Sequence, residues 1–172
     1  MLAGGKSYKE VGIGGMQPSP EDIAEMFRTV SLGAPEHAVG FVMWRMTHRF
    51  QREVDQAMRQ LDLTHLQFTV LAMAAWINRG GNPVVQAEIA RFGDIHPMQV
   101  SLVLKALERK GMIRRATRRG AAKVVSVTRR GLEVLRAAMP LAIAVQRRLF
   151  GKEGRPGGVL LETLLRLDRR QK

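Results

Sequence analysis

The residues best suited to chemistry in this chain are cations that gather between positions 109 and 130. This stretch holds nine Lys or Arg and no Asp or Glu: Arg109, Lys110, Arg114, Arg115, Arg118, Arg119, Lys123, Arg129 and Arg130. Cations at this density repel one another unless a polyanion is present, and their side chains bind phosphate oxygens well. The segment therefore predicts contacts with the phosphates of a nucleic acid.

A helix predicted over residues 97–110 precedes these cations and carries a second set of candidate contacts. Val100, Val103, Leu104 and Leu107 recur at the spacing of one buried stripe. At 100° per residue, the opposite face carries Met98, Ser101, Leu102, Lys105 and Arg109, and Gln99 lies at its flank. The exposed face is therefore a candidate for reading the grooves of a duplex.

Each candidate on this face could contact nucleic acid or could have only a structural or solvent-exposed role. Gln99 can hydrogen-bond an adenine edge, and Ser101 and Lys105 can contact either bases or phosphates. Met98 and Leu102 can pack on thymine methyl groups or simply against protein. The predicted DNA-binding residues are Met98, Gln99, Ser101, Leu102, Lys105, Arg109, Arg114, Arg115, Arg118, Arg119 and Lys123.

The elements that position these side chains form a short series. A helix over 86–92 is closed by Gly93, and the helix over 97–110 ends at Gly111. Strands are predicted over 112–117 and 123–127, joined by a loop at 118–122. A helix-turn-helix beside a basic hairpin, or wing, suits a duplex: the second helix enters the major groove and the wing reaches phosphates or the minor groove.

Longer helices flank this motif. The patterns predict helices over 36–60, 64–77, 128–150 and 159–170, a short helix near 20–30, and a brief strand at 84–85. The fold class is mainly α with a small β-hairpin wing, a winged helix-turn-helix with long N- and C-terminal dimerisation helices. The predicted organisation is a flexible extension (1–34), a first dimerisation helix (35–60), the DNA-binding domain (61–128) and C-terminal dimerisation helices (129–172).

Composition narrows the class of protein. The 172 residues carry a net charge of +13, which points to nucleic acid or an anionic surface. No apolar run is long enough to span a bilayer, so a cytoplasmic protein without a membrane partner is expected. There is no cysteine, and the four histidines show no metal spacing. We therefore expect no metal, no cofactor and no catalytic residue.

The predicted first long helix is apolar on more than one side. Beside its main stripe, Phe41, Trp44 and His48 form a second edge, which suggests either a partner subunit or a ligand crevice. His65, near the start of the next helix, is a further candidate. A broad stripe inside a small core explains the same residues equally well.

The order of these motifs resembles the multiple-antibiotic-resistance regulator (MarR) family of winged-helix transcription factors, over about residues 36–170. Three pieces carry the resemblance: Leu63-Thr64-His65-Leu66-Gln67-Phe68-Thr69-Val70-Leu71, Gln86-Ala87-Glu88-Ile89-Ala90, and Val100-Ser101 through Leu107-Glu108-Arg109-Lys110-Gly111-Met112-Ile113-Arg114-Arg115. Val125-Ser126-Val127-Thr128 with Gly131 is similar to the close of the family's wing. The order and spacing of the pieces, rather than any one of them, are specific.

The resemblance implies a homodimer that reads a pseudo-palindromic operator in double-stranded DNA. It also implies repression that a small molecule relieves, often a phenolic or aromatic acid. This chain departs from the family at two places. Arg119-Gly120-Ala121 stands where family wings often carry Asp-x-Arg, so that Arg118 or Arg119 takes the arginine's part, and Leu102 stands where many members have arginine.

Two functions from different classes remain open on the sequence. The first is a homodimeric repressor released by a small ligand, with Phe41, Trp44, His48 and His65 as candidate ligand contacts. The alternative is an architectural or RNA-associated winged-helix protein without a small-molecule response. An enzyme has the least support, because no polar groups converge in a pattern typical of a catalytic site.

Overall fold

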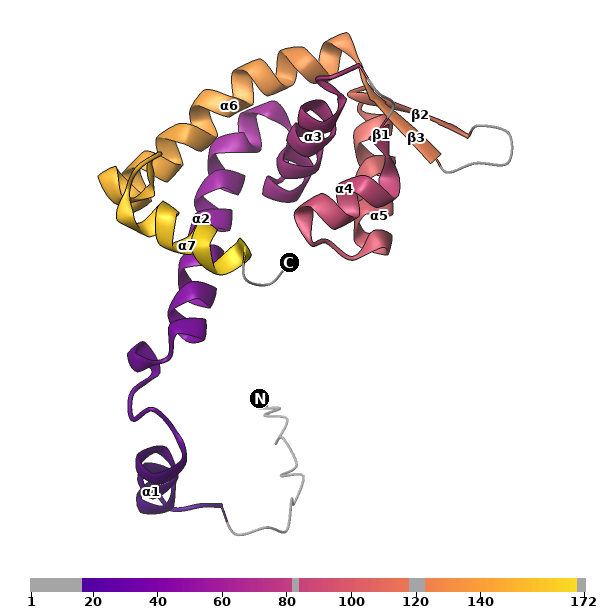
Figure 1. The fold of residues 1–172 in the computed structure, drawn as a ribbon. Coiled ribbons are helices and arrows are strands. Elements are labelled where there is room, and N and C mark those ends of the chain that lie inside the picture. The colour runs from indigo at the N-terminus through magenta and orange to yellow at the C-terminus, as the bar shows by residue number, and fades with distance from the viewer. Residues whose placement is uncertain (1–16, 82–83, 118–122, 170–172) are drawn as a thin grey trace, which may run out of the picture. The chain divides into compact units, whose positions relative to one another are not determined.

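A computed structural model describes residues 17–81, 84–117 and 123–169 (Figure 1). The chain divides into two compact units, residues 1–45 and 46–172, with the boundary inside the first long helix. The α-helices are α1 (Pro20–Val30), α2 (Val39–Met58), α3 (His65–Asn78), α4 (Gln86–Gly93), α5 (Pro97–Arg109), α6 (Arg129–Phe150) and α7 (Val159–Arg169). The strands are β1 (Val84–Val85), β2 (Ile113–Thr117) and β3 (Lys123–Val127), and short 3-10 turns occupy Pro35–His37, Arg59–Leu61 and Gly151–Gly154.

Helices α3, α4 and α5 pack together and against the sheet in the second unit. Thr64 caps α3 through a reciprocal pair of hydrogen bonds with Gln67, which fixes where this helix begins. The largest fully buried side chains are Met58, Leu71, Ile89, Leu104, Leu107, Ile113, Val54, Val70, Val84, Val100 and Val125. Burying one such side chain contributes about 1.5–3 kcal/mol, so this core is the main force that holds α5 in place.

The strands form one antiparallel sheet in the order β1-β3-β2. In β3, Val125 lies between Val84 of β1 and Arg115 of β2. The mainly helical fold with a small sheet confirms the predicted fold class, and the brief strand at 84–85 is present as β1. Because β1 covers one edge of β3, the wing is anchored on the core rather than on its hairpin partner alone.

Two local expectations need correction. The helix predicted from residue 36 begins at Val39, because residues 35–37 form a 3-10 turn and Ala38 is extended. The left-handed residue after α4 is Asp94, with φ of 48°, rather than Gly93. Gly93 lies close to the end of the Met73 side chain, since a Cβ atom there would lie 2.7 Å from the sulfur of Met73.

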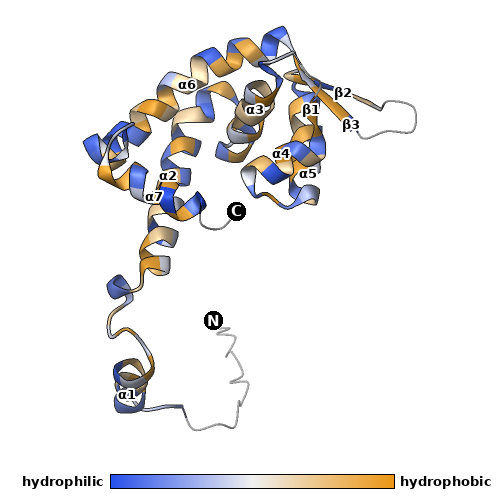
Figure 2. Ribbon diagram, in the orientation of Figure 1, coloured by the Kyte–Doolittle hydropathy of each residue, from blue (hydrophilic) through white to orange (hydrophobic). Residues whose placement is uncertain are grey.

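The two ends of the described chain are helical and leave apolar side chains exposed. In the first unit, none of the residues of α1 is buried, and Figure 2 shows both apolar and polar residues on this helix. In the second unit, α6 continues through Pro140, and α7 buries none of its residues. Val159, Leu160, Leu164, Leu165 and Leu167 of α7 are exposed. The predicted domain boundaries at 34, 60 and 128 remain predictions.

Two features are absent from the described part of the chain. None of its helices combines the length and apolarity that crossing a bilayer requires. Among the same residues, no three His, Asp or Glu side chains come together as a metal site would need.

The junction between the wing and α6 yields a stability prediction. Thr128 donates its hydroxyl to the carbonyl oxygen of Gly111 at 2.7 Å, and a Cβ atom on Gly131 would lie 2.1 Å from the carbonyl oxygen of Met112. We expect Gly131→Ala to lower the free energy of unfolding by about 3 kcal/mol, because backbone cannot move aside as a side chain can. Chemical denaturation measures this, and Gly80→Ala, with open space around its Cβ position, is the control that should change it little. Equal stability of the two variants would contradict the close approach.

Candidate nucleic-acid interface

Helix α5 separates its residues into a buried face and an exposed face. Val100, Leu104 and Leu107 are fully buried and Val103 is nearly so, which confirms the predicted stripe. On the opposite face Met98 is 68% exposed and Leu102 is 60% exposed. Gln99, Lys105 and Arg109 are exposed as well, and Ser101 is half-buried. The face predicted to meet DNA is thus turned away from the core.

The start of α5 is fixed by its own residues. Proline occupies the first helical turn at position 97, and the Nδ1 atom of His96 accepts a hydrogen bond from the backbone N–H of Met98 at 3.3 Å. The cap satisfies a backbone donor that would otherwise lack an intrahelical partner. Met98 and Gln99 therefore project from a defined first turn rather than from a frayed end.

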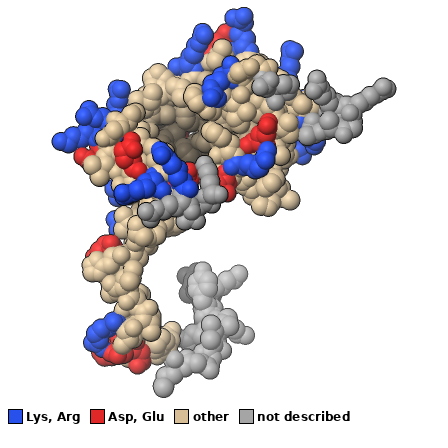
Figure 3. Space-filling model, in the orientation of Figure 1, with Lys and Arg blue, Asp and Glu red and all other residues tan. Residues whose placement is uncertain are grey.

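The cations of the basic segment divide into two groups. Arg109, Arg114, Lys123, Arg129 and Arg130 are exposed and make no ion pair within the described part of the chain. Lys110, by contrast, forms an ion pair with Asp62 at 3.2 Å and donates a hydrogen bond to Gln67 at 3.0 Å. The first group is available to phosphates, whereas Lys110 ties the end of α5 to the start of α3. Figure 3 shows Lys and Arg side chains over the start of α6 and beside the wing.

Arg115 is held by a residue of α5. One oxygen of Glu108 accepts a hydrogen bond from the backbone N–H of Arg115 at 3.0 Å. The other accepts from the Nε and Nη2 atoms of its guanidinium, at 2.8 and 2.5 Å. The side chain of Arg115 is only 16% exposed. We call this pair the helix-wing clamp, because it joins α5 to β2 through three hydrogen bonds.

The helix-wing clamp also changes the acidity of its carboxylate. The side-chain hydrogen bond from Arg115 is the main cause that lowers the pKa of Glu108 below its ordinary value; desolvation opposes it, and the backbone hydrogen bond and positive charge of Arg115 add to the lowering. A carboxylate with a lowered pKa stays ionised further into the acid range, so the clamp persists at neutral pH and weakens only as the pH falls through that lowered value.

Two of the predicted wing contacts, Arg118 and Arg119, lie outside the described residues. Their assignment to the DNA interface stays a prediction. Arg114 and Lys123 are the exposed cations of the wing that the structure does place, on β2 and β3 respectively.

The candidate ligand residues fall into separate places. In the first unit, the rings of Phe41 and Trp44 stack with centroids 6.2 Å apart, and Phe41 also lies under the guanidinium of Arg45. In the second unit, His65 lines a cavity of about 490 Å³, and His48 lines an adjacent hollow of about 590 Å³. Gln51 and Asp55 border both hollows, so the hollows of His48 and His65 are neighbours along α2.

The cavity at His65 extends to the first turn of α5. It is lined by Gln51, Asp55, Thr64, His65, Leu66, Thr69, Gly93, Ile95 and Gln99. These residues come from α2, the start of α3, the α4–α5 turn and the first turn of α5. A molecule bound there would touch Gln99, which was predicted only as a DNA contact.

His65 is the titratable group on the wall of this cavity. Its ring lies edge-on to Phe50 with centroids 5.6 Å apart, and its backbone N–H donates to the carboxylate of Asp55. Burial lowers the pKa of His65 below 6.5, although the charge of Asp55 acts in the opposite direction. The imidazole is therefore neutral at pH 7 and can both donate and accept hydrogen bonds.

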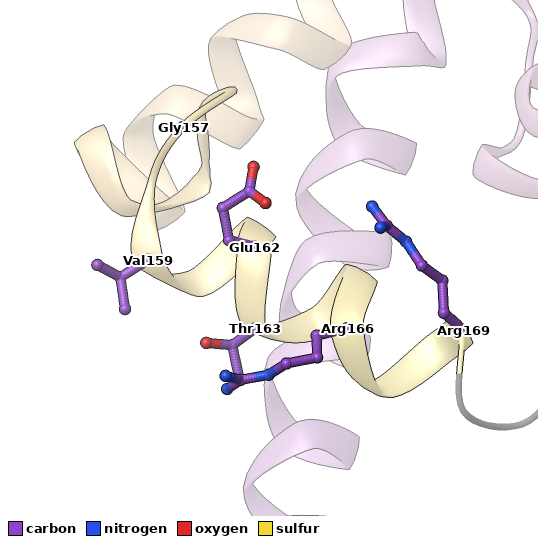
Figure 4. Close-up of a pocket in the computed structure, with 6 residues that line it drawn as sticks. All are labelled: Gly157, Val159, Glu162, Thr163, Arg166 and Arg169. Atoms are coloured by element: carbon purple, nitrogen blue, oxygen red, sulfur yellow. The ribbon is translucent and has the colours of Figure 1, made fainter.

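Another hollow, of about 600 Å³, runs along α7 and is remote in sequence from the predicted interface (Figure 4). It is lined by Gly157, Val159, Glu162, Thr163, Arg166 and Arg169. Figure 4 shows the side chain of Val159 pointing away from those of Glu162 and Arg169. The hollow is open and gathers no set of groups with a common chemistry, so its size alone does not make it a site.

Sequence reasoning missed the role of Glu108 and misjudged the surroundings of Arg115. A signal was present, because residues two apart in a strand share a face and Arg115 follows Ile113 by two positions. Ile113 is buried, so Arg115 must point toward the same side and needs an acidic partner there. Glu108 is the acidic residue nearest in sequence before it.

Comparison with known proteins places this fold. The model of the MarR family matches residues 63–123. An uncharacterized HTH-type transcriptional regulator of Bacillus subtilis (strain 168), YdcH, is 34% identical over 118 residues, which are 67% of this chain and 80% of that protein.

Solved structures agree in fold at lower identity. The Staphylococcus aureus MepR–DNA complex has a TM-score of 0.66 at 20% identity, covering 81% of this chain and 100% of that one. CouR from Rhodococcus jostii RHA1 bound to p-coumaroyl-CoA has a TM-score of 0.67 at 24% identity, covering 78% and 91%. At these identities the likeness shows the fold alone. Together with the curated relative and the matched family residues, it shows that this chain belongs to the MarR family of winged-helix transcriptional regulators.

Proposed function

We propose that this chain is a homodimeric repressor that binds a pseudo-palindromic operator and releases it when a small molecule binds. The two opposed faces of α5, one buried and one exposed, are the main support for this proposal. Its buried stripe fixes the helix on the core, while Met98, Leu102, Lys105 and Arg109 are left exposed beside a basic wing. A helix fixed on its inner side and exposed on its outer side can enter a major groove without rearranging the core.

The predicted contacts divide by the kind of recognition they provide. Arg114 and Lys123, with Arg118 and Arg119, supply affinity by neutralising phosphates. Gln99, Ser101 and Lys105 supply the direct base contacts, and the exposed Leu102 and Met98 pack on thymine methyl groups. Arg115 is a positioning residue, since Glu108 already occupies its guanidinium.

A second copy of the chain is part of the proposal because exposed apolar side chains need cover. Helix α7 exposes Leu160, Leu164 and Leu167 in the single chain. Isolated apolar patches of this kind are typical of subunit interfaces. Two copies would also set two α5 helices in successive grooves of one duplex face, as a pseudo-palindrome requires.

The cavity at His65 supports control by a small molecule, because its wall includes Gln99 of α5. CouR, a structural neighbour, has p-coumaroyl-CoA bound. For an aromatic acid, we propose that the ring lies against Leu66 and Ile95. The carboxylate of Asp55 already accepts a hydrogen bond from the backbone N–H of His65, and it would repel the carboxylate of a ligand. The ligand's carboxylate would therefore turn toward Arg52 and Arg59 in the adjoining hollow.

The alternative, an architectural or RNA-associated protein, would use the same exposed face of α5. It would differ from a repressor in showing little preference for one nucleic-acid sequence over another. Selecting bound duplexes from a random pool separates the two. A repressor enriches one pseudo-palindrome, whereas an architectural protein enriches none and is displaced equally well by random duplex or RNA. Recovery of no common sequence would contradict the repressor.

The wing's share in affinity is tested by salt dependence. On the selected duplex, we expect replacing Arg118 and Arg119 with Ala to reduce the slope of log affinity against log salt by about 1.8, because each phosphate contact contributes about 0.9. Fluorescence anisotropy at several salt concentrations measures the slope. Arg155→Ala, an exposed arginine remote in sequence from α5 and the wing, should leave it unchanged. The same slope in the double variant would remove these two arginines from the interface.

Arg114 and Arg115 provide a matched pair, since neighbours on β2 point to opposite faces. We expect Arg114→Ala to reduce the salt slope by about 0.9, as the loss of one phosphate contact requires. Arg115→Ala should weaken binding while the slope stays the same, and Glu108→Gln should behave likewise. The double variant Glu108→Gln/Arg115→Ala should be no worse than either single variant, because both break one clamp. A reduced slope for Arg115→Ala would show that Arg115 meets phosphate after all.

The ligand cavity is tested by filling it. Thr69 lines the cavity and is half-buried. We expect Thr69→Leu to raise the concentration of aromatic acid that releases half of the DNA by about tenfold, since the added carbons occupy the ligand's space. Affinity for DNA without ligand should not change. Ala137→Leu, an exposed position on α6, is the control. Unaltered release by Thr69→Leu would place the effector elsewhere.

A further inference from the structure

Two apolar side chains of α5 are left exposed. Met98 is 68% exposed and Leu102 is 60% exposed, and because they are four residues apart they lie on the same side of the helix. That side is opposite the buried stripe of Val100, Leu104 and Leu107. Helix α5 therefore has a second, smaller apolar surface that the core does not cover, and we call Met98 and Leu102 the apolar pair.

The surroundings of the apolar pair are basic. Lys105 and Arg109 follow it on the same side of α5 and are exposed, and Arg114 of β2 is exposed as well. The only acid of α5, Glu108, is held by the guanidinium of Arg115. A groove of duplex DNA matches both features, because it places phosphates on either side of a floor of base edges. Charge thus selects DNA, rather than an apolar patch on a protein, as the cover of the pair.

The apolar pair lies in the half of α5 that is best placed to reach bases. Met98 is the second residue of the helix and Leu102 is the sixth, and Lys105 and Arg109 come after them. In a helix-turn-helix the first residues of the second helix contact base edges. Four residues advance a helix by about 6 Å, which is close to two base-pair steps of about 3.4 Å. One α5 can therefore place the two side chains on separate bases.

The chemistry of the apolar pair limits what it can recognise. A leucine side chain has no hydrogen-bonding group, and the thioether of methionine is only a weak acceptor. Neither side chain can read the donors and acceptors on a base edge. The major groove also presents one methyl group, at C5 of thymine. The base 5-methylcytosine carries the same methyl group at the same ring position, although it pairs with guanine.

We propose that Met98 and Leu102 recognise the C5-methyl group itself, so that 5-methylcytosine is accepted at the positions where they contact thymine. The protein then binds a duplex with cytosine at such a position more tightly when that cytosine is methylated. This methyl recognition rests on the proposed binding of an operator by α5, and it extends the recognised class from thymine to 5-methylpyrimidines.

Replacing thymine with deoxyuridine tests the methyl contact, because deoxyuridine lacks only the C5-methyl group and keeps the same base pairing. Each thymine in one half-site of the selected duplex is replaced in turn, and fluorescence anisotropy measures the dissociation constant with the full-length protein. We expect two positions at which the replacement weakens binding about fourfold, the effect of exposing one buried methyl-sized group.

Protein variants then assign each position to a side chain. In Leu102→Ala, binding at one of the two positions should no longer distinguish thymine from deoxyuridine, because alanine is too short to reach the methyl group. Met98→Ala should do the same at the other position. Phe92→Ala is the matched control, since Phe92 is an apolar side chain of α4 that is 59% exposed. It should leave the preference for thymine unchanged at both positions.

Methylated cytosine tests the extension to a second base. At the position assigned to Leu102, the thymine–adenine pair is replaced by cytosine–guanine, with or without a methyl group at C5 of the cytosine. We expect the methylated duplex to bind about fourfold more tightly than the unmethylated one. In Leu102→Ala the two duplexes should bind equally, because the methyl group has lost its contact.

The outcomes separate methyl recognition from the proposed function. A loss with deoxyuridine that disappears in Leu102→Ala or Met98→Ala, together with tighter binding of the methylated duplex, supports the proposal. A selected duplex that deoxyuridine does not weaken overturns it and leaves the repressor intact. Sensitivity that survives both alanine variants also overturns it, because another residue would then read the methyl group. Equal binding of cytosine and 5-methylcytosine overturns the extension to 5-methylpyrimidines. Failure to select any duplex overturns the proposed function as well.

Discussion

The burial of one side of α5 is the constraint on which the rest of this structure depends. Val100, Leu104 and Leu107 lose all contact with solvent against α3, α4 and the sheet, and each such burial stabilises the fold by about 1.5–3 kcal/mol. A helix fixed in this way cannot rotate without exposing those side chains. Met98, Leu102, Lys105 and Arg109 must then face outward. The same apolar contacts that build the core therefore decide which residues can reach a groove.

The helix-wing clamp transmits that fixed position to the sheet. Glu108 accepts hydrogen bonds from both the backbone and the guanidinium of Arg115, so β2 cannot move independently of α5. Lys110 does the same at the end of α5 by reaching Asp62 and Gln67. Arg115 and Lys110, two cations of the basic segment, are thus paired with groups of the protein itself. The cations left exposed form a smaller group on β2, β3 and the start of α6.

The cavity at His65 lies beside the first turn of α5. His65, Asp55 and Gln99 come from three helices and border one space. Because burial lowers the pKa of His65 and the carboxyl group of Asp55 lines the same wall, the cavity is not a general trap for anions. The aromatic acid proposed above would fill it with its uncharged part and turn its carboxylate toward Arg52 and Arg59. Such a ligand would press on the first turn of α5, where His96 and Pro97 fix the helix start.

Local sequence patterns were sufficient for much of the fold. The stripe of α5, the caps at Thr64 and Ser19, and the paired valines of β3 each depend on residues within a few positions of one another. Such short-range patterns also indicated the brief strand β1. Where the pattern was weaker, boundaries shifted: α2 begins at Val39 because Pro35 starts a separate turn, and the left-handed residue after α4 is Asp94. Gly93 lies against the side chain of Met73, which is twenty residues away in sequence.

By itself, then, the sequence determined the helices, the wing, the charge and the face of α5 that is free, because these follow from periodicity and composition along one short stretch. Only the tertiary structure decided that Arg115 and Lys110 are held by Glu108 and Asp62 and that Gln99 borders the cavity of His65. Each of these depends on side chains brought together by packing between elements, and the free energy of that packing is a property of the whole core rather than of any local pattern.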